Sequence, residues 1–232
     1  MKTTKNKEVS VQEKEEEPKS ERTENLVAIG VFIFIILIGL AIFTKGFGLF
    51  EKAGNETARI RIPLGNDPYI GSENSKILII AFSEYECPFC TESESTMKSI
   101  REKYAAEVVY VFKDYPLTRI HPNAYNAALA AECAKEQDKY WEYHDLLYEH
   151  NDQLEPHYLE EYAGLVGLDT EKFKACFETQ KYKLEVEKDI LTGKQVGVSG
   201  TPTFFINGIM VVGAKAEEEF IKIINSELDA NK

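Results

Sequence analysis

The sequence lacks the excess of basic residues that nucleic-acid binding requires. Lys and Arg number 27 against 39 Asp and Glu, which gives a formal net charge of −12. Residues 58–232 alone contain 19 basic and 30 acidic side chains. A protein that binds nucleic acid presents a basic face to the phosphates. We therefore expect a solvated acidic surface and no nucleic-acid partner.

Cysteine and histidine are also scarce, with four residues of each. A zinc site needs four ligands, and Cys87 and Cys90 could supply two of them, but no second close Cys or His pair follows. The histidines are scattered, and we interpret each as a surface or capping residue: His121, His144, His150 and His157. We expect no metal and no cofactor.

The first 25 residues contain no aromatic side chain and almost nothing apolar, but six basic residues and seven Glu. Such a segment cannot bury enough apolar surface to become ordered. We predict a disordered charged tail over residues 1–25.

Residues 26–43 (LVAIGVFIFIILIGLAIF) contain no charged side chain. As a helix they would be about 27 Å long, enough to cross the hydrocarbon core of a bilayer. A cleavable signal peptide and a buried soluble helix are the alternatives. The charged region is long and acidic for a signal peptide, and no small-x-small cleavage site occurs before Lys45. We therefore predict an uncleaved, single-pass transmembrane helix, followed by a linker over residues 44–57.

Residues 58–232 show the pattern of one α/β domain. Alternating apolar residues at 60–62 predict a short edge strand, and the continuous apolar run at 77–82 predicts a buried central strand. Residues 91–104 follow as a predicted helix and residues 108–112 as a second buried strand. These three elements form a βαβ unit.

A long helical stretch follows, at about residues 120–195, and the chain then returns to strands. The predicted helices are 123–135, 140–149, 158–166, 170–177 and 181–194. The predicted strands 203–206 and 209–212 are joined by the turn Asn207-Gly208, and a closing helix spans 216–228. The domain therefore has a βαβ half and a ββα half with a helical insert between them.

A C-x-x-C motif, Cys87-Pro88-Phe89-Cys90, lies where the first buried strand gives way to a helix. A thiol at a helix N-terminus faces unpaired N–H groups and the positive end of the helix dipole, which lowers its pKa. Cys87 is therefore the candidate nucleophile and Cys90 the resolving cysteine. Pro88 suits the first helical turn because it has no N–H to lose.

Residues 79–90 (IIAFSEYECPFC), the pair Thr201-Pro202 in VSGTPTFFING, and the helical segment between them resemble the DsbA-like thiol–disulfide oxidoreductases of the thioredoxin superfamily. The resemblance covers roughly residues 60–230. It implies a thioredoxin fold with an inserted helical domain. It also implies a cis peptide at Pro202 and a Thr201 backbone that pairs with the substrate.

Cys133 and Cys176 look like the second cysteine pair of many such relatives. A bridge between them would close a loop of about 44 residues and stabilise the fold by roughly 4 kcal/mol at most. Two buried reduced thiols, natural in a cytosol, are the alternative. A bridge would indicate an oxidising compartment. The positive-inside rule is close to a tie, so on these redox grounds we expect a cytoplasmic N-terminus and an extracytoplasmic domain.

The motifs and the resemblance lead us to expect an oxidase that introduces disulfides into exported proteins and is re-oxidised by a quinone-linked membrane partner. A reductase or isomerase of the same fold, and a non-enzymatic chaperone-like module, remain as alternatives. We expect a monomer.

Phe89 replaces the His of the best-known family member, which predicts a milder oxidant. Ala81 replaces an acidic residue of many relatives, and we interpret the nearby Glu84 and Glu86 as solvated.

Overall fold

The computed structural model describes residues 29–37, 59–72 and 74–230. The chain divides into two compact units, of which the second spans Thr57–Lys232. In the first unit, residues 29–37 form a helix with exposed side chains. The predicted tail, the linker and the remaining residues of the predicted span 26–43 lie outside the described residues. Within the described ranges, no helix is long and apolar enough to cross a membrane.

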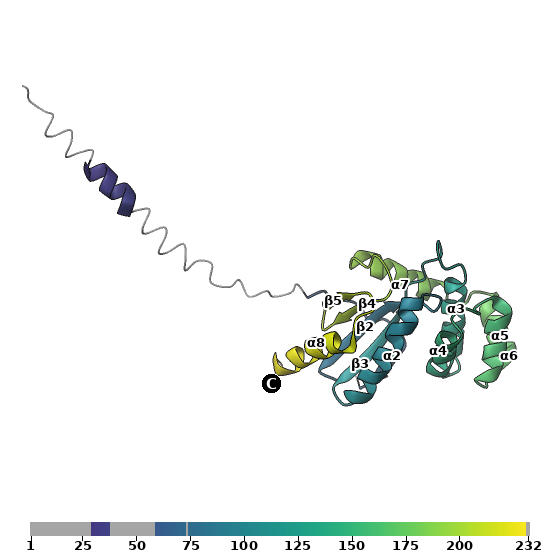
Figure 1. Cartoon of the computed structure of the whole chain (residues 1–232). Coiled ribbons are helices and arrows are strands. Elements are labelled where there is room, and N and C mark those ends of the chain that lie inside the picture. Colours follow the sequence, from purple (N-terminus) through teal and green to yellow (C-terminus); the bar gives the residue numbers. More distant parts are fainter. Residues whose placement is uncertain (1–28, 38–58, 73, 231–232) are drawn as a thin grey trace, which may run out of the picture. The chain divides into compact units, whose positions relative to one another are not determined.

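The second unit is built on a sheet whose described strands have the order β1-β3-β2-β4-β5 (Figure 1). The strands are Tyr69–Gly71 (β1), Ile77–Ser83 (β2), Val108–Asp114 (β3), Thr203–Ile206 (β4) and Ile209–Val212 (β5). β2 pairs with β3 in parallel, and the remaining neighbours pair antiparallel. β2 is therefore the central strand, which explains why its sequence is a continuous apolar run.

Helices cover both faces of this sheet. The helices are Pro88–Lys103 (α2), Ala124–Lys135 (α3), Tyr140–Glu149 (α4), Pro156–Leu165 (α5), Thr170–Glu178 (α6), Lys183–Gln195 (α7) and Glu217–Ala230 (α8). Alternate residues of a strand point to opposite faces. Ile77 and Ile79 accordingly pack in the large core with residues of α2 to α6 and α8, whereas Ile80 and Phe82 pack with Ile190 of α7 on the other face. The predicted order of a βαβ half, a helical insert and a ββα half is confirmed.

The turn between β4 and β5 is formed by Asn207 and Gly208, whose φ angles are 47° and 85°. Positive φ at both positions suits the right-handed twist of a hairpin, and Asn-Gly tolerates it. The Asn207 side chain also accepts a hydrogen bond from the Leu78 N–H at 2.8 Å. The turn is thereby fixed to the start of the central strand.

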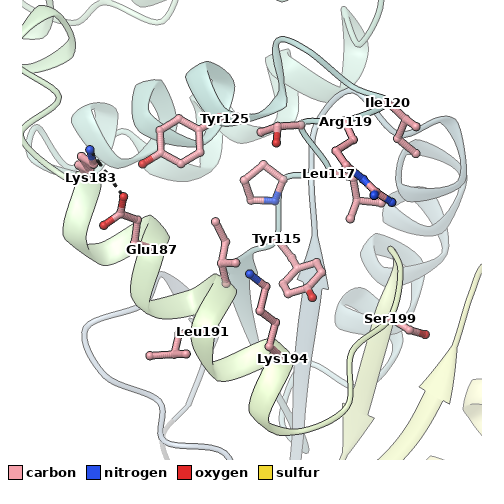
Figure 2. Close-up of a pocket in the computed structure, with 13 residues that line it drawn as sticks. Tyr115, Leu117, Arg119, Ile120, Tyr125, Lys183, Glu187, Leu191, Lys194 and Ser199 are labelled. Atoms are coloured by element: carbon pink, nitrogen blue, oxygen red, sulfur yellow. Dashed lines mark ion pairs between the residues drawn. The ribbon is translucent and has the colours of Figure 1, made fainter.

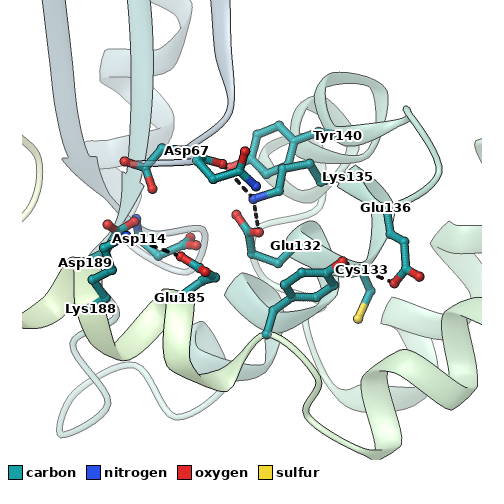
Figure 3. A network of polar contacts seen from close by, with 12 residues as sticks. Asp67, Asp114, Glu132, Cys133, Lys135, Glu136, Tyr140, Glu185, Lys188 and Asp189 are labelled. Atoms are coloured by element: carbon teal, nitrogen blue, oxygen red, sulfur yellow. Dashed lines mark hydrogen bonds and ion pairs between the residues drawn. The ribbon is translucent and has the colours of Figure 1, made fainter. Parts of the chain in front are cut away.

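A buried ionic network fixes α7 to the end of β3 (Figure 3). The Lys113 side chain is 1% exposed and pairs with Asp67 and with Asp189 of α7, the latter at 2.8 Å. The Asp114 N–H donates to the second oxygen of Asp189 at 3.1 Å. Burial raises the pKa of Asp189 to about 7, and the charge of Asp67 adds to the shift. Lys113 therefore neutralises carboxylates that come from two distant segments.

The prediction of an edge strand at residues 60–62 is wrong. These residues form no ladder, although the Ile60 N–H donates to the Gly208 carbonyl at 3.0 Å. The edge strand nearest in sequence is β1, which follows the turn at Gly65. Ile60 and Ile62 instead pack against the sheet face that α7 covers. Their alternation reflects this one-sided packing and not strand pairing.

Candidate redox site

The two cysteines of the C-x-x-C motif lie at the junction of β2 and α2. Cys87 has an extended backbone and is the N-cap of α2, and Pro88 occupies the first helical turn. The Cys87 carbonyl accepts from the Cys90 N–H at 3.0 Å, so the two cysteines are one turn apart. Both are free thiols in this structure. The predicted position of the motif, at a strand-to-helix junction with Pro88 in the first helical turn, is therefore confirmed.

The fold brings the distant Thr201-Pro202 pair to this motif. The peptide bond between Thr201 and Pro202 is cis, as the resemblance implies. The Cys87 Sγ lies 3.7 Å from the Thr201 carbonyl oxygen. A segment just before β4 thus forms one wall of the site.

The two thiols differ in acidity. The pKa of Cys87 is lowered to about 5, chiefly by a hydrogen bond from the Cys90 thiol, and also by the Cys90 and Phe89 backbone amides and by Thr201. Burial raises the pKa of Cys90 far above its ordinary value, and the hydrogen bond to Cys87 and the Cys87 charge raise it further. Near neutral pH the site therefore holds a thiolate at Cys87 and a protonated thiol at Cys90.

The two residues between the cysteines, Pro88 and Phe89, are much more exposed than the sulfurs. Cys87 is 3% exposed and Cys90 is 1% exposed, whereas Phe89 is 60% exposed. Pro88 is exposed as well. A reacting partner therefore meets an apolar rim before it reaches Cys87.

Hydroxyl groups lie beneath Cys90. The Ser83 side chain hydrogen-bonds the Cys90 sulfur, and the Ser83 hydroxyl is 2.9 Å from the Tyr148 hydroxyl. Tyr148 belongs to a ring cluster with Tyr85 and Phe112. Tyr148 is 5% exposed and lies in the large core.

The two glutamates before the motif have different environments. Glu84 is 1% exposed and pairs with the ring of His121, and its other oxygen accepts from the Glu86 N–H at 2.7 Å. Glu86 caps α3 by accepting from the Asn123 N–H at 2.7 Å. The interpretation of Glu84 as solvated is wrong, because the segment folds under the loop that carries His121. Glu86 is half-buried and serves as a helix cap.

Burial changes the acidity of Glu84. It raises the Glu84 pKa to about 7, even though the charge of His121 and the hydrogen bond from the Glu86 amide act in the opposite direction. A thiolate at Cys87 raises the Glu84 pKa further. The carboxyl group is therefore electrostatically linked to the Cys87 thiol.

Cys133 of α3 and Cys176 of α6 form a disulfide with a Cα–Cα distance of 5.9 Å. The pairing implied by the resemblance is thus present in the structure. Because both helices belong to the insert, this bond fixes the insert and is separate from the C-x-x-C pair. The four cysteines therefore divide into one free pair and one bridged pair.

A group within the described residues has possible metal-ligand atoms close together: Glu94, His144 and Asp145. Glu94 already pairs with Arg101 at 2.9 Å and accepts from the Tyr110 hydroxyl at 3.1 Å. The carboxylate is thus neutralised by a protein cation. His144 is fully buried and packs in the core, so its interpretation as a surface residue is wrong.

A groove of about 730 Å³ runs between α7 and the loop after β3 (Figure 2). Its lining includes apolar side chains and three basic side chains, one of which, Lys183, pairs with Glu187. It reaches Ile120, next to His121, and Ser199, two residues before Thr201. Its lining includes neither thiol of the redox site nor Thr201.

Sequence reasoning identified the thiols, Thr201 and Pro202 but missed Ser83 and His121. Neither has a local sequence signal, because Ser83 ends a strand and His121 is an isolated loop residue. The 37-residue separation between Glu84 and His121 is bridged only in the folded chain.

A free C-x-x-C at the first strand-to-helix junction, beside a cis X-Pro bond, defines a thioredoxin-fold protein with a dithiol site. The family model described as thioredoxin matches residues 64–226. The chain therefore belongs to this thioredoxin family, and its fold is that of the DsbA-like thiol–disulfide oxidoreductases, with a helical insert.

Solved structures share this fold at low sequence identity. BdbD from Bacillus subtilis (oxidised) has a TM-score of 0.68 and 21% identity, over 75% of this chain and 100% of that chain. The thiol-disulfide exchange protein α-DsbA2 from Wolbachia pipientis has a TM-score of 0.63 and 23% identity, over 69% and 86%.

Curated relatives are longer proteins. The chain is 37% identical over 138 residues to Na(+)/H(+) antiporter NhaA 3 of Salinispora tropica, which is 60% of this chain and 21% of that protein. It is 31% identical over 188 residues to Na(+)/H(+) antiporter NhaA 1 of Mycolicibacterium vanbaalenii, 79% of this chain and 30% of that protein. The chain thus spans less than a third of the length of these relatives.

Proposed function

We propose that this protein is a thiol–disulfide oxidoreductase that oxidises cysteines of exported proteins through Cys87 and Cys90. The observation that carries the proposal is the unequal acidity of the two thiols, with the Cys87 pKa lowered to about 5 and the Cys90 pKa raised. A stable Cys87 thiolate is a good leaving group and favours the reduced enzyme, which makes the disulfide form an oxidant.

The reaction begins with the Cys87–Cys90 disulfide. A substrate thiolate attacks the Cys87 sulfur, the disulfide breaks, and Cys90 leaves with the electron pair and takes up a proton. A second substrate thiolate then attacks the substrate sulfur of the mixed disulfide, and Cys87 leaves as a thiolate. The substrate is oxidised by two electrons and the enzyme is reduced. Thr201 borders the Cys87 sulfur, which supports the proposed pairing of its backbone with a substrate chain.

The proposed location is the outer face of a cell membrane, with residues 26–43 as the anchor and the N-terminus in the cytoplasm. The Cys133–Cys176 disulfide supports an oxidising compartment. Continued turnover requires an acceptor for two electrons, and a quinone-linked membrane protein would serve. The domain is proposed to act as a monomer. A reductase with the same site would run these steps in reverse.

A direct assay tests this proposal. The oxidised full-length chain, purified in detergent, is mixed with a reduced, unfolded protein that contains two cysteines, and the loss of substrate thiols is followed. We expect one substrate disulfide per enzyme. Cys90→Ser lacks the resolving thiol, so its Cys87 thiolate should form a lasting mixed disulfide with the oxidised form of the same substrate. Cys87→Ser is the control and should be inactive. Unchanged substrate thiols with the oxidised wild-type chain would exclude the oxidase activity.

A further inference from the structure

The groove between α7 and the loop after β3 is held in shape by the packing of the domain (Figure 2). Tyr115, which lines it, is 7% exposed and donates from its hydroxyl to the Val198 carbonyl at 3.0 Å. A Cβ at Gly193 of α7 would lie 2.6 Å from the Tyr115 ring, so the helix packs directly on that ring. The groove volume of about 730 Å³ lies in the range of ligand-binding clefts.

The charge of the groove is opposite to that of the protein. Its lining carries three basic side chains, Arg119, Lys183 and Lys194, and one acidic side chain, Glu187. Three positive charges and one negative charge give a local charge of +2, against −12 for the whole chain. Lys183 pairs with Glu187 at 3.7 Å, whereas Arg119 and Lys194 are exposed and form no ion pair among the described residues. Two cations are thus available to an anionic partner.

Each of these two cations has an exposed apolar neighbour. Ile120, next to Arg119, is 67% exposed, and Leu191, one helical turn before Lys194, is 56% exposed. Figure 2 shows Arg119 on the loop and Lys194 on α7, on opposite sides of the groove. Exposed apolar side chains beside unpaired cations favour a partner that carries both acidic and apolar groups.

The groove is long enough for a short stretch of extended chain. From Lys183 to Lys194, which both line it, α7 rises by about 16 Å. A chain that rises about 3.3 Å per residue would place about five residues along this length. An extended polypeptide suits such a site better than a compact anion, because the apolar lining continues along the helix.

One end of the groove is connected to the redox site by a short segment of chain. Ser199 lines the groove and lies two residues before Thr201, whose carbonyl oxygen is 3.7 Å from the Cys87 Sγ. Two residues span at most about 7 Å, so the Ser199 end lies on the order of 10 Å from this sulfur. A substrate chain bonded to Cys87 would reach the groove within about three residues.

We propose that this groove binds an acidic and apolar segment of the substrate chain while a neighbouring substrate cysteine reacts at Cys87. Arg119 and Lys194 contact the acidic side chains from opposite walls, and Ile120 and Leu191 contact the apolar ones. The inference rests on the proposed function and names its substrate class: exported proteins whose reactive cysteine lies a few residues from such a segment.

The overall charge of the protein predicts the opposite preference. A net charge of −12 attracts basic peptides and repels acidic ones. Acidic side chains near a cysteine also raise the pKa of its thiol, which lowers the fraction of reactive thiolate. Faster oxidation of an acidic peptide would therefore point to a local basic site.

The test uses three reduced peptides of equal length. Each contains Cys-Ala-Ala-Cys between two segments in which Leu alternates with Glu, Gln or Lys. The oxidised full-length chain in detergent is mixed with each peptide at pH 7, and every rate is divided by the rate with the uncharged dithiol dithiothreitol. We expect the Glu peptide to react at least about tenfold faster than the Lys peptide at low ionic strength, and this ratio to fall toward one in high salt.

Two double variants separate the groove from the overall charge. Arg119→Glu/Lys194→Glu should lower the ratio of the Glu-peptide rate to the Lys-peptide rate at least about tenfold. The control is Lys103→Glu/Lys222→Glu, which changes the net charge equally on exposed residues of α2 and α8 outside the groove. It should keep the ratio within about twofold of wild type. A cooperative thermal transition checks folding, and Arg119→Gln/Lys194→Gln replaces the first variant if it does not fold.

A binding measurement identifies the occupant. A labelled Glu peptide with Ser in place of Cys is bound to the chain, and its fluorescence anisotropy is followed as unlabelled peptide or glycerol phosphate is added. Displacement at a lower concentration of peptide than of glycerol phosphate supports the proposal. The reverse order would assign the groove to a phosphate head group and overturn it.

Two kinetic outcomes would also overturn the proposal. One is a wild-type chain that oxidises the three peptides at equal rates or prefers the Lys peptide. The other is an equal change of the ratio in both double variants, which would assign the preference to overall charge. A wild-type chain that oxidises neither dithiothreitol nor any peptide refutes the oxidoreductase function itself, which is a separate result.

Discussion

The Cys87 Sγ lies 3.7 Å from the carbonyl oxygen of Thr201, although 114 residues separate them in the chain. The insert of helices α3 to α7 lies between these two residues in the sequence. The redox site is thus completed by two halves of one sheet domain, and its chemistry depends on the fold as well as on the motif.

The reactivity of Cys87 should follow a low pKa. We expect the alkylation rate of the reduced full-length chain by iodoacetamide to titrate with a midpoint near pH 5, because the Cys90 thiol and neighbouring amides stabilise the Cys87 thiolate. Cys90 should remain unmodified at neutral pH, since burial raises its pKa. Mass spectrometry of the alkylated peptide distinguishes the two sites. A midpoint near that of a free cysteine would contradict this prediction.

The reduced form should be more stable than the oxidised form at pH 7. A group whose pKa is lowered on folding contributes stability above its unfolded pKa, and this contribution is lost as the pH falls through its folded value. For Cys87, whose pKa is lowered to about 5 by the hydrogen bond from the Cys90 thiol, this loss is complete near pH 5. We expect the unfolding free energy of the reduced form to exceed that of the oxidised form by about 3 kcal/mol at pH 7. This difference should narrow toward pH 5, and urea unfolding of both forms measures it. An oxidised form that is more stable at pH 7 would refute it.

Phe89 should limit the oxidising strength of the site. It is 60% exposed in the first turn of α2 and carries no charge. In Phe89→His a protonated imidazole would stabilise the Cys87 thiolate, and we expect the Cys87 pKa to fall by about one unit. The exchange equilibrium with glutathione should move toward the reduced enzyme. Phe89→Ala controls for loss of the ring and should leave the Cys87 pKa closer to wild type.

The sequence predicts elements well where the signal is local. The central strand β2 is a continuous apolar run, and the C-x-x-C marks the start of α2. The Glu84–His121 pair could not be predicted, because its partners meet only through the path of the loop after β3. Lys113 is a similar case. The predicted strand ends at Phe112, yet the observed strand continues through Lys113, whose charge is neutralised inside the fold by Asp67 and Asp189.

Lys113 should be essential for stability. Lys113→Met removes the cation that Asp67 and Asp189 share in a buried site. Loss of one partner of a buried pair costs about 3–5 kcal/mol, because the carboxylates remain without compensation. Lys183→Met is the matched control, since its exposed pair with Glu187 contributes at most about 1 kcal/mol. Urea unfolding of the full-length chain measures both.

The effect of Lys113→Met should depend on pH. The Asp189 pKa is raised to about 7 by burial, so its stabilising protonated form is present below its unfolded pKa and is lost as the pH rises through 7. Without Lys113 the carboxylates should protonate at still higher pH. The loss of unfolding free energy relative to wild type should therefore be largest above pH 7 and become smaller toward pH 5. A deficit that does not vary with pH would indicate a packing defect instead.

The Cys133–Cys176 disulfide should stabilise the fold without tuning the redox pair. Its two cysteines are 43 residues apart in sequence and join α3 to α6. In the chain-entropy description, a loop of this length contributes up to about 4 kcal/mol by restricting the unfolded chain. We expect the double variant Cys133→Ala/Cys176→Ala to lose a large part of this amount in urea unfolding of the full-length chain. Its Cys87 alkylation rate at pH 7 should stay within twofold of wild type, because the groups that stabilise the thiolate are Cys90, Phe89 and Thr201. A variant that keeps the wild-type unfolding free energy, or one that loses Cys87 reactivity while still folded, would contradict the separation of a structural pair from a redox pair.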